Sequence, residues 1–213
     1  MRTLRVAAGA VAVLALGVAA ARAQPLTVAE VNAPAIPCVF HPACIITVSD
    51  TVGFIPLPFL AAPNAAFLQS RTFSGAAGTP AAGRAGYMYR ISLTQASGSG
   101  GCLGGLVLNF GPALKLPYAP DKLADVFVIT SGGIGSIGLK SAERFGEVIE
   151  FDLAKPLCLE GAPNLANTTF FFGLAADTPS RATSAQIFSS GNPPSIAWTR
   201  ACRAIEVAVV HSK

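Results

Sequence analysis

The sequence has few charged side chains and few of the residue types on which most enzyme chemistry depends. Only 12% of the residues are charged, and the chain contains two histidines and one tryptophan. No Gly-x-Ser-x-Gly motif occurs, so a serine hydrolase with a nucleophile elbow has no support. The two histidines, His41 and His211, lie far apart in the sequence, whereas a catalytic or metal site needs converging partners. These absences argue against the common hydrolase and metalloenzyme classes.

Residues 1–23 have the composition of a secretory signal peptide. Two arginines precede an uncharged apolar run over residues 6–20, and Ala21-Arg22-Ala23 forms a small-x-small cleavage site. The apolar run is shorter than the roughly 20 residues that a membrane-spanning helix needs. We therefore expect a cleaved signal peptide and export to the periplasm or the exterior. The mature chain, residues 24–213, is expected to contain no membrane span.

The remaining chain is close to electrically neutral. Residues 1–23 carry three of the 15 basic side chains and none of the 11 acidic ones, so the formal charge of the remainder is +1. Such a chain gives no electrostatic reason to expect nucleic acid or an anionic membrane as a partner. Its length is sufficient for one well-buried core, so we expect residues 24–213 to form a single domain.

Alternation of apolar and polar residues is the main structural signal after residue 23. It is clearest at 87–94, 148–153 and 204–209, and it is typical of half-buried strands. Glycine and proline clusters between these segments mark turns. We expect an all-β fold, an antiparallel two-sheet β-sandwich (Ig-like or jelly-roll-like) with about nine to eleven strands, from the turn spacing. Further strands are expected at 44–49, 66–74, 104–110, 125–130, 168–175, 182–189 and 195–199.

Helical periodicity is weak throughout the mature chain. The one helix candidate is LKSAERF at 139–145, which gives two turns at most and stops at Gly146. The glycine- and alanine-rich segment 75–86 is expected to form a flexible loop, because its glycine spacing is irregular. The three phenylalanines at 170–172 suit a strand that is covered on both faces.

A dinucleotide-binding pattern, Gly-x-Gly-x-x-Gly, occurs at Gly133, Gly135 and Gly138 after an apolar run. The pattern has meaning only where a strand leads into a helix that crosses back over the sheet. Only eight residues separate Gly138 from the next expected strand, which is too few for a crossover of a dozen residues. We therefore expect the glycines to permit positive φ in a tight connection between antiparallel strands, with no nucleotide cofactor.

Five cysteines in an exported chain suggest disulfides. Cys38 and Cys44 are close enough for a local bridge, and Cys102 with Cys158 would then form a long-range one. This leaves Cys202 as a candidate free thiol, although spacing alone does not fix the pairing and Cys202 could replace another partner. His41 lies between Cys38 and Cys44 and could add a zinc ligand, but export and the lack of a clear fourth ligand favour the disulfide.

Carboxylates and aromatic rings supply the remaining candidate sites. Asp121 and Asp125 are weak candidates for calcium, because oxygen ligands are present without the density of a strong calcium loop. Glu150 and Asp152 share one strand face, with Glu143 and Glu147 nearby, which is the minimum for a carboxylate-dependent glycoside hydrolase. Exposed rings could form a sugar platform. Trp198 is the preferred candidate for ligand contact, and Tyr118, Tyr87 and Tyr89 are others, the last two being expected in the core.

Four segments stand out: IPCVFHPACIITVSDTVG (36–53), SRTFSGAAGTPAAGRAGYMYRISLTQA (70–96), DVFVITSGGIGSIG (125–138) and TTFFFGLAADTP (168–179). They give the chain a resemblance to a group of exported bacterial β-rich proteins with no established activity. Some members of that group carry a PEP-CTERM-type sorting tail. The resemblance implies an extracytoplasmic β-rich domain in which Cys102 pairs with Cys158. It also implies a more acidic, glycine-containing loop where this chain has YAPDKLAD (118–125), which weakens calcium further.

The expected function is a non-enzymatic, extracytoplasmic binding or structural module. Edge strands, loops or exposed rings would contact a glycan or a protein of the envelope or the exterior. The alternative is an exported hydrolase that acts on polysaccharide through carboxylates, which requires two acids from different strands to converge in one cleft. No cofactor is expected.

Overall fold

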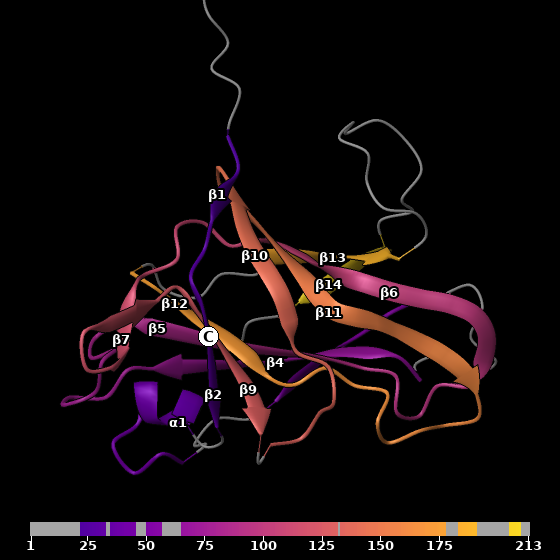
Figure 1. Cartoon of the computed structure of the whole chain (residues 1–213), viewed down its shortest axis with the longest axis horizontal. Coiled ribbons are helices and arrows are strands. Elements are labelled where there is room, and N and C mark those ends of the chain that lie inside the picture. Colours follow the sequence, from indigo (N-terminus) through magenta and orange to yellow (C-terminus); the bar gives the residue numbers. More distant parts are fainter. Residues whose placement is uncertain are drawn as a thin grey trace, which may run out of the picture.

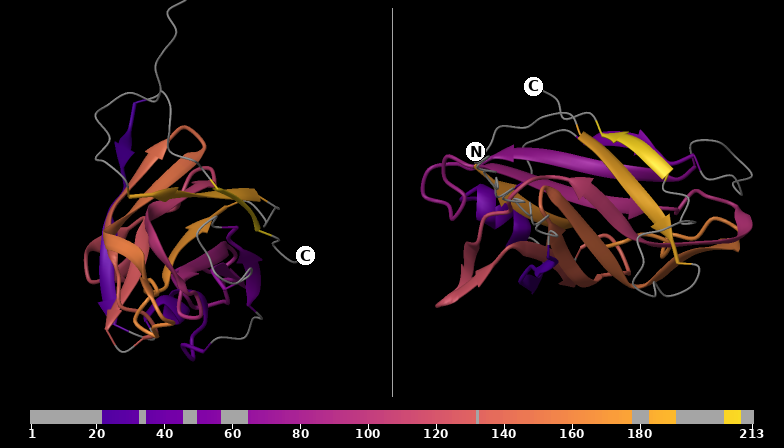
Figure 2. Two further views of the ribbon diagram at one scale, coloured as in Figure 1. Left: turned by 90° about the vertical axis from the view of Figure 1, so that its right-hand side faces the viewer. Right: turned by 90° about the horizontal axis from the view of Figure 1, so that it is seen from above.

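The computed structural model describes residues 22–32, 35–45, 50–56, 65–131, 133–177, 183–190 and 205–209. Within these ranges it contains 14 strands and one helix, so the predicted all-β fold is confirmed. Two six-stranded sheets, named sheet A and sheet B, face each other as the two layers of a sandwich (Figures 1 and 2). There are more strands than expected, because several consist of only two to five residues.

Sheet A is antiparallel at every pairing between its strands. Its long central strands, β6 and β11, carry the alternating apolar residues that the sequence predicts near residue 150. The strand order is β1 (Gln24–Pro25), β10 (Leu139–Phe145), β11 (Val148–Gly161), β6 (Gly98–Asn109), β13 (Thr183–Ser189) and β14 (Ile205–Val209).

Sheet B is mixed, because its first two strands run parallel and the others antiparallel. The sequence predicts antiparallel sheets, and the pair β2–β9 is the exception among the described strands. The order is β2 (Val28–Asn32), β9 (Val126–Ser131), β12 (Phe172–Ala176), β5 (Ala85–Ser92), β4 (Phe67–Ser74) and β3 (Thr51–Phe54).

The main core lies between the two sheets. Strand alternation points Tyr87, Tyr89 and Ile91 of β5 toward sheet A, where Phe151 and Ile149 of β11 meet them. Both tyrosines are buried, as the sequence predicts. The Phe172 ring of β12 packs against the Phe151 ring with centroids 5.0 Å apart, which joins the two sheets through an aromatic contact.

A second apolar cluster covers the outer face of sheet B. Phe171 and Phe172 are both buried but belong to different clusters, which confirms that this run is covered on both faces. The cover consists of helix α1 (Ala35–Phe40), the loop at 75–84 and a small hairpin of β7 (Leu116–Ala119) and β8 (Lys122–Ala124). Figure 1 shows α1 and β7 beside sheet B. The sequence pattern does not predict α1, whose Pro37 lies in the first turn, where proline is tolerated.

The segment 139–145 is a strand, so the predicted helix is wrong. It is β10, paired with β1 on one side and β11 on the other. A bulge between Leu139 and Ser141 shifts the register, so that Leu139 and Ala142 are both buried. Their spacing of three residues imitates one turn of an amphipathic helix, and the pairing with two neighbouring strands overrides the local helix propensity.

The glycine-rich segment after β9 is not a dinucleotide-binding turn. The chain leaves sheet B at Ser131 and enters sheet A as β10, with no helix after Gly138. The expected tight connection between two antiparallel strands is also wrong, because β9 and β10 belong to different sheets and the segment between them crosses from one sheet to the other. Gly135 has a φ of 130°, and a Cβ there would lie 2.5 Å from the Thr169 carbonyl oxygen. Glycine is therefore required for this close backbone approach.

Two disulfides are present, with the pairing preferred from the sequence. Cys38 of α1 is bonded to Cys44, and Cys102 of β6 is bonded to Cys158 of β11. The second pair lies in register across the two central strands of sheet A. Cys38 and Cys44 are thus not thiolates, which rules out the zinc alternative that used both of them with His41. Cys202 lies outside the described residues.

The N-terminal segment connects the two sheets at one edge of the sandwich. Leu26 donates its N–H to the Ala142 carbonyl in sheet A, at 2.9 Å. The next residue, Thr27, accepts from the Asp125 N–H and donates to the Asp125 Oδ2 beside sheet B, at 2.9 and 2.8 Å. At the opposite edge, β14 of sheet A contacts β3 of sheet B. The edge strands β14 and β3 therefore cover each other in part.

Candidate functional site

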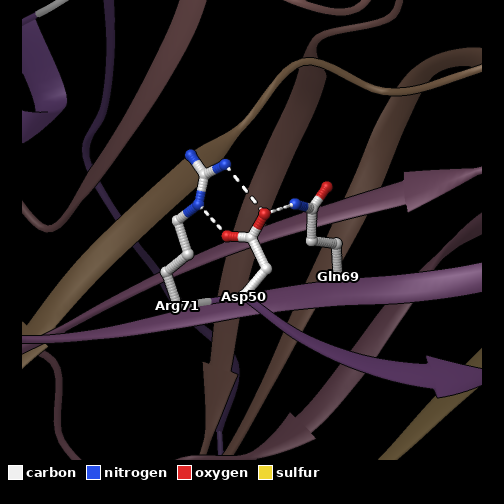
Figure 3. A network of polar contacts seen from close by, with 3 residues as sticks. All are labelled: Asp50, Gln69 and Arg71. Carbon is white, nitrogen blue, oxygen red and sulfur yellow. Dashed lines mark hydrogen bonds and ion pairs between the residues drawn. The ribbon is translucent and has the colours of Figure 1, made fainter. Parts of the chain in front are cut away.

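A polar cluster lies on the outer face of sheet B, beside the apolar cover. Asp50 precedes β3, and Gln69 and Arg71 follow each other with i, i+2 spacing on β4, so the three side chains converge (Figure 3). Arg71 donates Nε to Asp50 Oδ1, and its Nη2 lies 3.1 Å from Asp50 Oδ2. Gln69 donates Nε2 to the same Oδ2. Asp50 is thus held by a bidentate arginine and an amide.

A second arginine joins this cluster from the neighbouring strand. Arg90 of β5 lies directly opposite Gln69 in register. The guanidinium carbons of Arg71 and Arg90 lie 4.2 and 5.0 Å from the centroid of the Phe171 ring, so both cations share one aromatic ring. Two positive groups therefore face one carboxylate, which leaves the cluster with one positive charge.

The electrostatics of the cluster follow from this imbalance. The hydrogen bond from Arg71 is the main reason that the pKa of Asp50 lies below its usual value. Burial is the first cause that lowers the pKa of Arg90, and the charge of Arg71 is the second. Asp50 acts in the opposite direction on Arg90, but it is already paired with Arg71. Arg90 is therefore the less well compensated of the two cations.

Exposed apolar side chains continue the same sheet face. In register, Val52 of β3 lies opposite Gln69, and Phe54 lies opposite Phe67. Phe54 is 51% exposed and Val52 is 45% exposed. The face thus presents a cationic group and an apolar edge strand next to each other.

An apolar pocket of about 350 Å³ lies at the other end of the covered face. The Tyr118 ring of β7 is 37% exposed and packs edge-on against Phe127 of β9, with centroids 6.2 Å apart. Residues of α1, the 75–84 loop, the hairpin and sheet B form the walls, so the pocket depends on the second apolar cluster. The lining residues are Val31, Cys38, Val39, Pro80, Pro117, Tyr118, Ala119 and Phe127.

The two calcium candidates, Asp121 and Asp125, lie immediately before and immediately after β8. Asp121 is exposed at the β7–β8 turn and has a φ of 59°. Asp125 is buried at the start of β9, where it accepts from Thr27 and lies 3.8 Å from Lys115 Nζ. Its carboxylate therefore has a structural task at the junction of the sheets. Among the described residues, no three or more His, Cys, Asp or Glu side chains gather as a metal site.

The carboxylates proposed for hydrolysis lie on the outer face of sheet A. Glu143 of β10 is directly opposite Glu150 of β11, and Ser141 donates to Asp152 Oδ2 at 2.9 Å. Burial is the main cause that raises the pKa of Glu150, followed by the charges of Asp152 and Glu143. None of these acids lines the pocket near Tyr118.

We expect Glu150→Gln to change how stability depends on pH. Because the pKa of Glu150 is raised in the folded state, the folded protein binds more protons than the unfolded chain above the ordinary glutamate pKa. Stability therefore falls as pH rises through that range. Urea unfolding between pH 4 and 8 should show a smaller fall in the variant. An unchanged slope would contradict this assignment, and Glu147→Gln, at an exposed turn, is the control.

Trp198, the preferred ligand contact from the sequence, lies outside the described residues, as does His211. His41 follows α1, and its Nδ1 accepts the N–H of Ala43 at 3.2 Å. The paired arginines were missed because the signal for them is a contact between distant strands. The available signal was that Arg90 occupies the opposite face of β5 from the core tyrosines.

No family model, curated protein or solved structure matches the chain. None of the described helices has the length and apolar character needed to span a membrane.

Proposed function

We propose that the protein is a non-enzymatic, extracytoplasmic binding module for a glycan or a protein of the envelope or the exterior. The pocket at Tyr118 is the observation that carries this proposal. It is concave and mainly apolar, and it presents a partly exposed ring, which are the usual features of a binding site. The two disulfides fit an oxidising compartment, and residues 1–23 have the character of a signal peptide.

We expect Tyr118→Ala to weaken binding of the partner about tenfold, because it removes one aromatic anchor from a small apolar site. A glycan array and an envelope pull-down with the purified chain would identify the partner, and calorimetry would give Kd for both proteins. Leu165→Ala is the matched control, since Leu165 is an exposed apolar residue outside the pocket. Blank results from both screens would contradict the proposal.

A carboxylate-dependent polysaccharide hydrolase is the second candidate. The cross-strand pair of Glu143 and Glu150, together with the raised pKa of Glu150, is the observation in its favour. A pair of acids on a sheet face lacks the substrate cleft that glycoside hydrolysis uses to hold the sugar. The test is whether the purified chain releases reducing sugar from polysaccharide. If it does, and if Glu150→Gln abolishes this release, the protein is a hydrolase and not a binding module.

A further inference from the structure

The Arg90 guanidinium is a cation without an anion of its own. No hydrogen bond or ion pair joins this group to another residue in the part of the chain that the structure describes, and its Nε is enclosed without a partner. Arginine stays protonated in proteins, so the charge remains despite the burial. A partly desolvated charge is costly unless a counter-ion approaches it. The cluster is therefore incomplete as it stands.

The contact with Phe171 leaves the N–H groups of Arg90 available. A guanidinium above an aromatic ring is attracted through its charge, so the contact does not use its N–H groups as hydrogen-bond donors. The edge of Arg71 is occupied by Asp50. Nε is the only nitrogen of Arg90 that is fully enclosed without a partner, so its two Nη groups keep some contact with solvent. These groups suit a planar carboxylate, which accepts two parallel hydrogen bonds.

Gln69 gives an independent sign that the cluster lacks a partner. The residue is only 7% exposed, and its Oε1 is enclosed with no hydrogen-bond partner among the described residues. It lies opposite Arg90 on the adjacent strand. An amide oxygen needs a hydrogen-bond donor, which a carboxylate cannot supply but a sugar hydroxyl can. Unsatisfied buried groups are rare in folded proteins and concentrate at sites with a function. The two unpaired atoms, Gln69 Oε1 and Arg90 Nε, lie on neighbouring positions of β4 and β5.

The charge balance and the neighbours indicate the class of ligand. Arg71, Arg90 and Asp50 together leave one positive charge, which one monoanionic carboxylate neutralises. A phosphate dianion would exceed that charge, and Asp50 would repel it more strongly than it repels a monoanion. Val52 and Phe54 offer an apolar edge on the same face, against which the C–H face of a sugar ring can pack.

We propose that the outer face of sheet B binds, at Arg90, the carboxylate of a uronic acid unit in an acidic polysaccharide. The inference goes beyond the proposed function, because the site shares no residue with the pocket at Tyr118. Either site can therefore fail without the other.

The test is an NMR titration of the ¹⁵N-labelled chain, observing the Nε–Hε resonances of its arginines. The probes are a galacturonate trimer, a neutral galactose trimer, inorganic phosphate and a short polyglutamate peptide. The uronate trimer should shift the Arg90 resonance and saturate. Arg90→Gln should raise Kd about tenfold, since the fork of charged hydrogen bonds is lost. Lys155→Gln, which removes an exposed charge from sheet A, should leave Kd unchanged.

A second variant separates binding from folding. Asp50→Asn removes the competing carboxylate and frees the Arg71 edge, so the uronate should bind more tightly. Weaker or unchanged binding in this variant would overturn the proposal. Equal shifts with the neutral trimer would show that charge is not recognised. Tighter binding of phosphate or of the peptide would show that a uronate is not the preferred ligand. If no probe shifts the Arg90 resonance, Arg90 is not a binding site.

Discussion

Replacing both cysteines of the Cys102–Cys158 bridge with alanine is expected to lower the free energy of unfolding by about 4 kcal/mol, on the loop-entropy account of disulfides. The bridge spans a sequence separation of 56 residues, and it joins β6 to β11 at positions already in register. Breaking the bridge raises the conformational entropy of the unfolded chain, whereas the folded chain keeps the two strands paired. The loss is a large share of the 5–15 kcal/mol that stabilises a typical domain.

The Cys38–Cys44 bridge is the internal control for this expectation. Its sequence separation is 6, so the same account predicts a loss of about 2.4 kcal/mol for the double alanine variant. Urea unfolding of both variants under non-reducing conditions, followed by circular dichroism, gives the comparison. The loop-entropy explanation would be wrong for this fold if the short bridge mattered as much as the long one.

A second large effect is expected from Gly86→Ala in β5. A Cβ at this position would lie 2.0 Å from the Phe40 ring, which packs over the outer face of sheet B. Phe40 is fully buried and stacks on Phe73, with centroids 5.2 Å apart, so it has little room to move. We expect a loss of about 2–3 kcal/mol, in the upper range for overpacking a core.

A double-mutant cycle tests the cause of that loss. Phe40→Ala alone should cost about 3–5 kcal/mol, as for other buried phenylalanines. In that background the alanine at position 86 has room, so its cost should fall nearly to zero, and the two effects should not add. Additive losses, measured by urea unfolding, would show that Gly86 is needed for its backbone and not for the contact with Phe40.

The sequence predicts those parts of the fold that depend on local alternation. The tyrosines of β5 and the apolar residues of β11 repeat every second residue, and the structure buries them as expected. The error at 139–145 has a local origin too, because the bulge after Leu139 gives a strand the spacing of a helix. Helix α1 was missed because six residues containing Pro37 carry too little periodicity to detect.

The candidate sites depend on information that the sequence pattern does not contain. Arg71 and Arg90 meet Phe171 only because β12 inserts beside β5 in sheet B, far from its neighbours in the chain. Tyr118 was among the ring candidates, but its pocket requires α1 and the 75–84 loop to close over the sheet. Sheet order and long-range register decide both sites, and alternation within one strand specifies neither.

The segment that connects the two sheets has a consequence for biogenesis. Thr27 pairs with Asp125, 98 residues later, and the Gln24 side chain pairs with Arg144, 120 residues later. A ribosome makes the N-terminal end first, so β2 and β1 have no partner strand until β9 and β10 have been synthesised. During that interval they are unpaired β-strands, which are prone to mispairing. This edge of the sandwich can therefore close only after synthesis has reached Arg144.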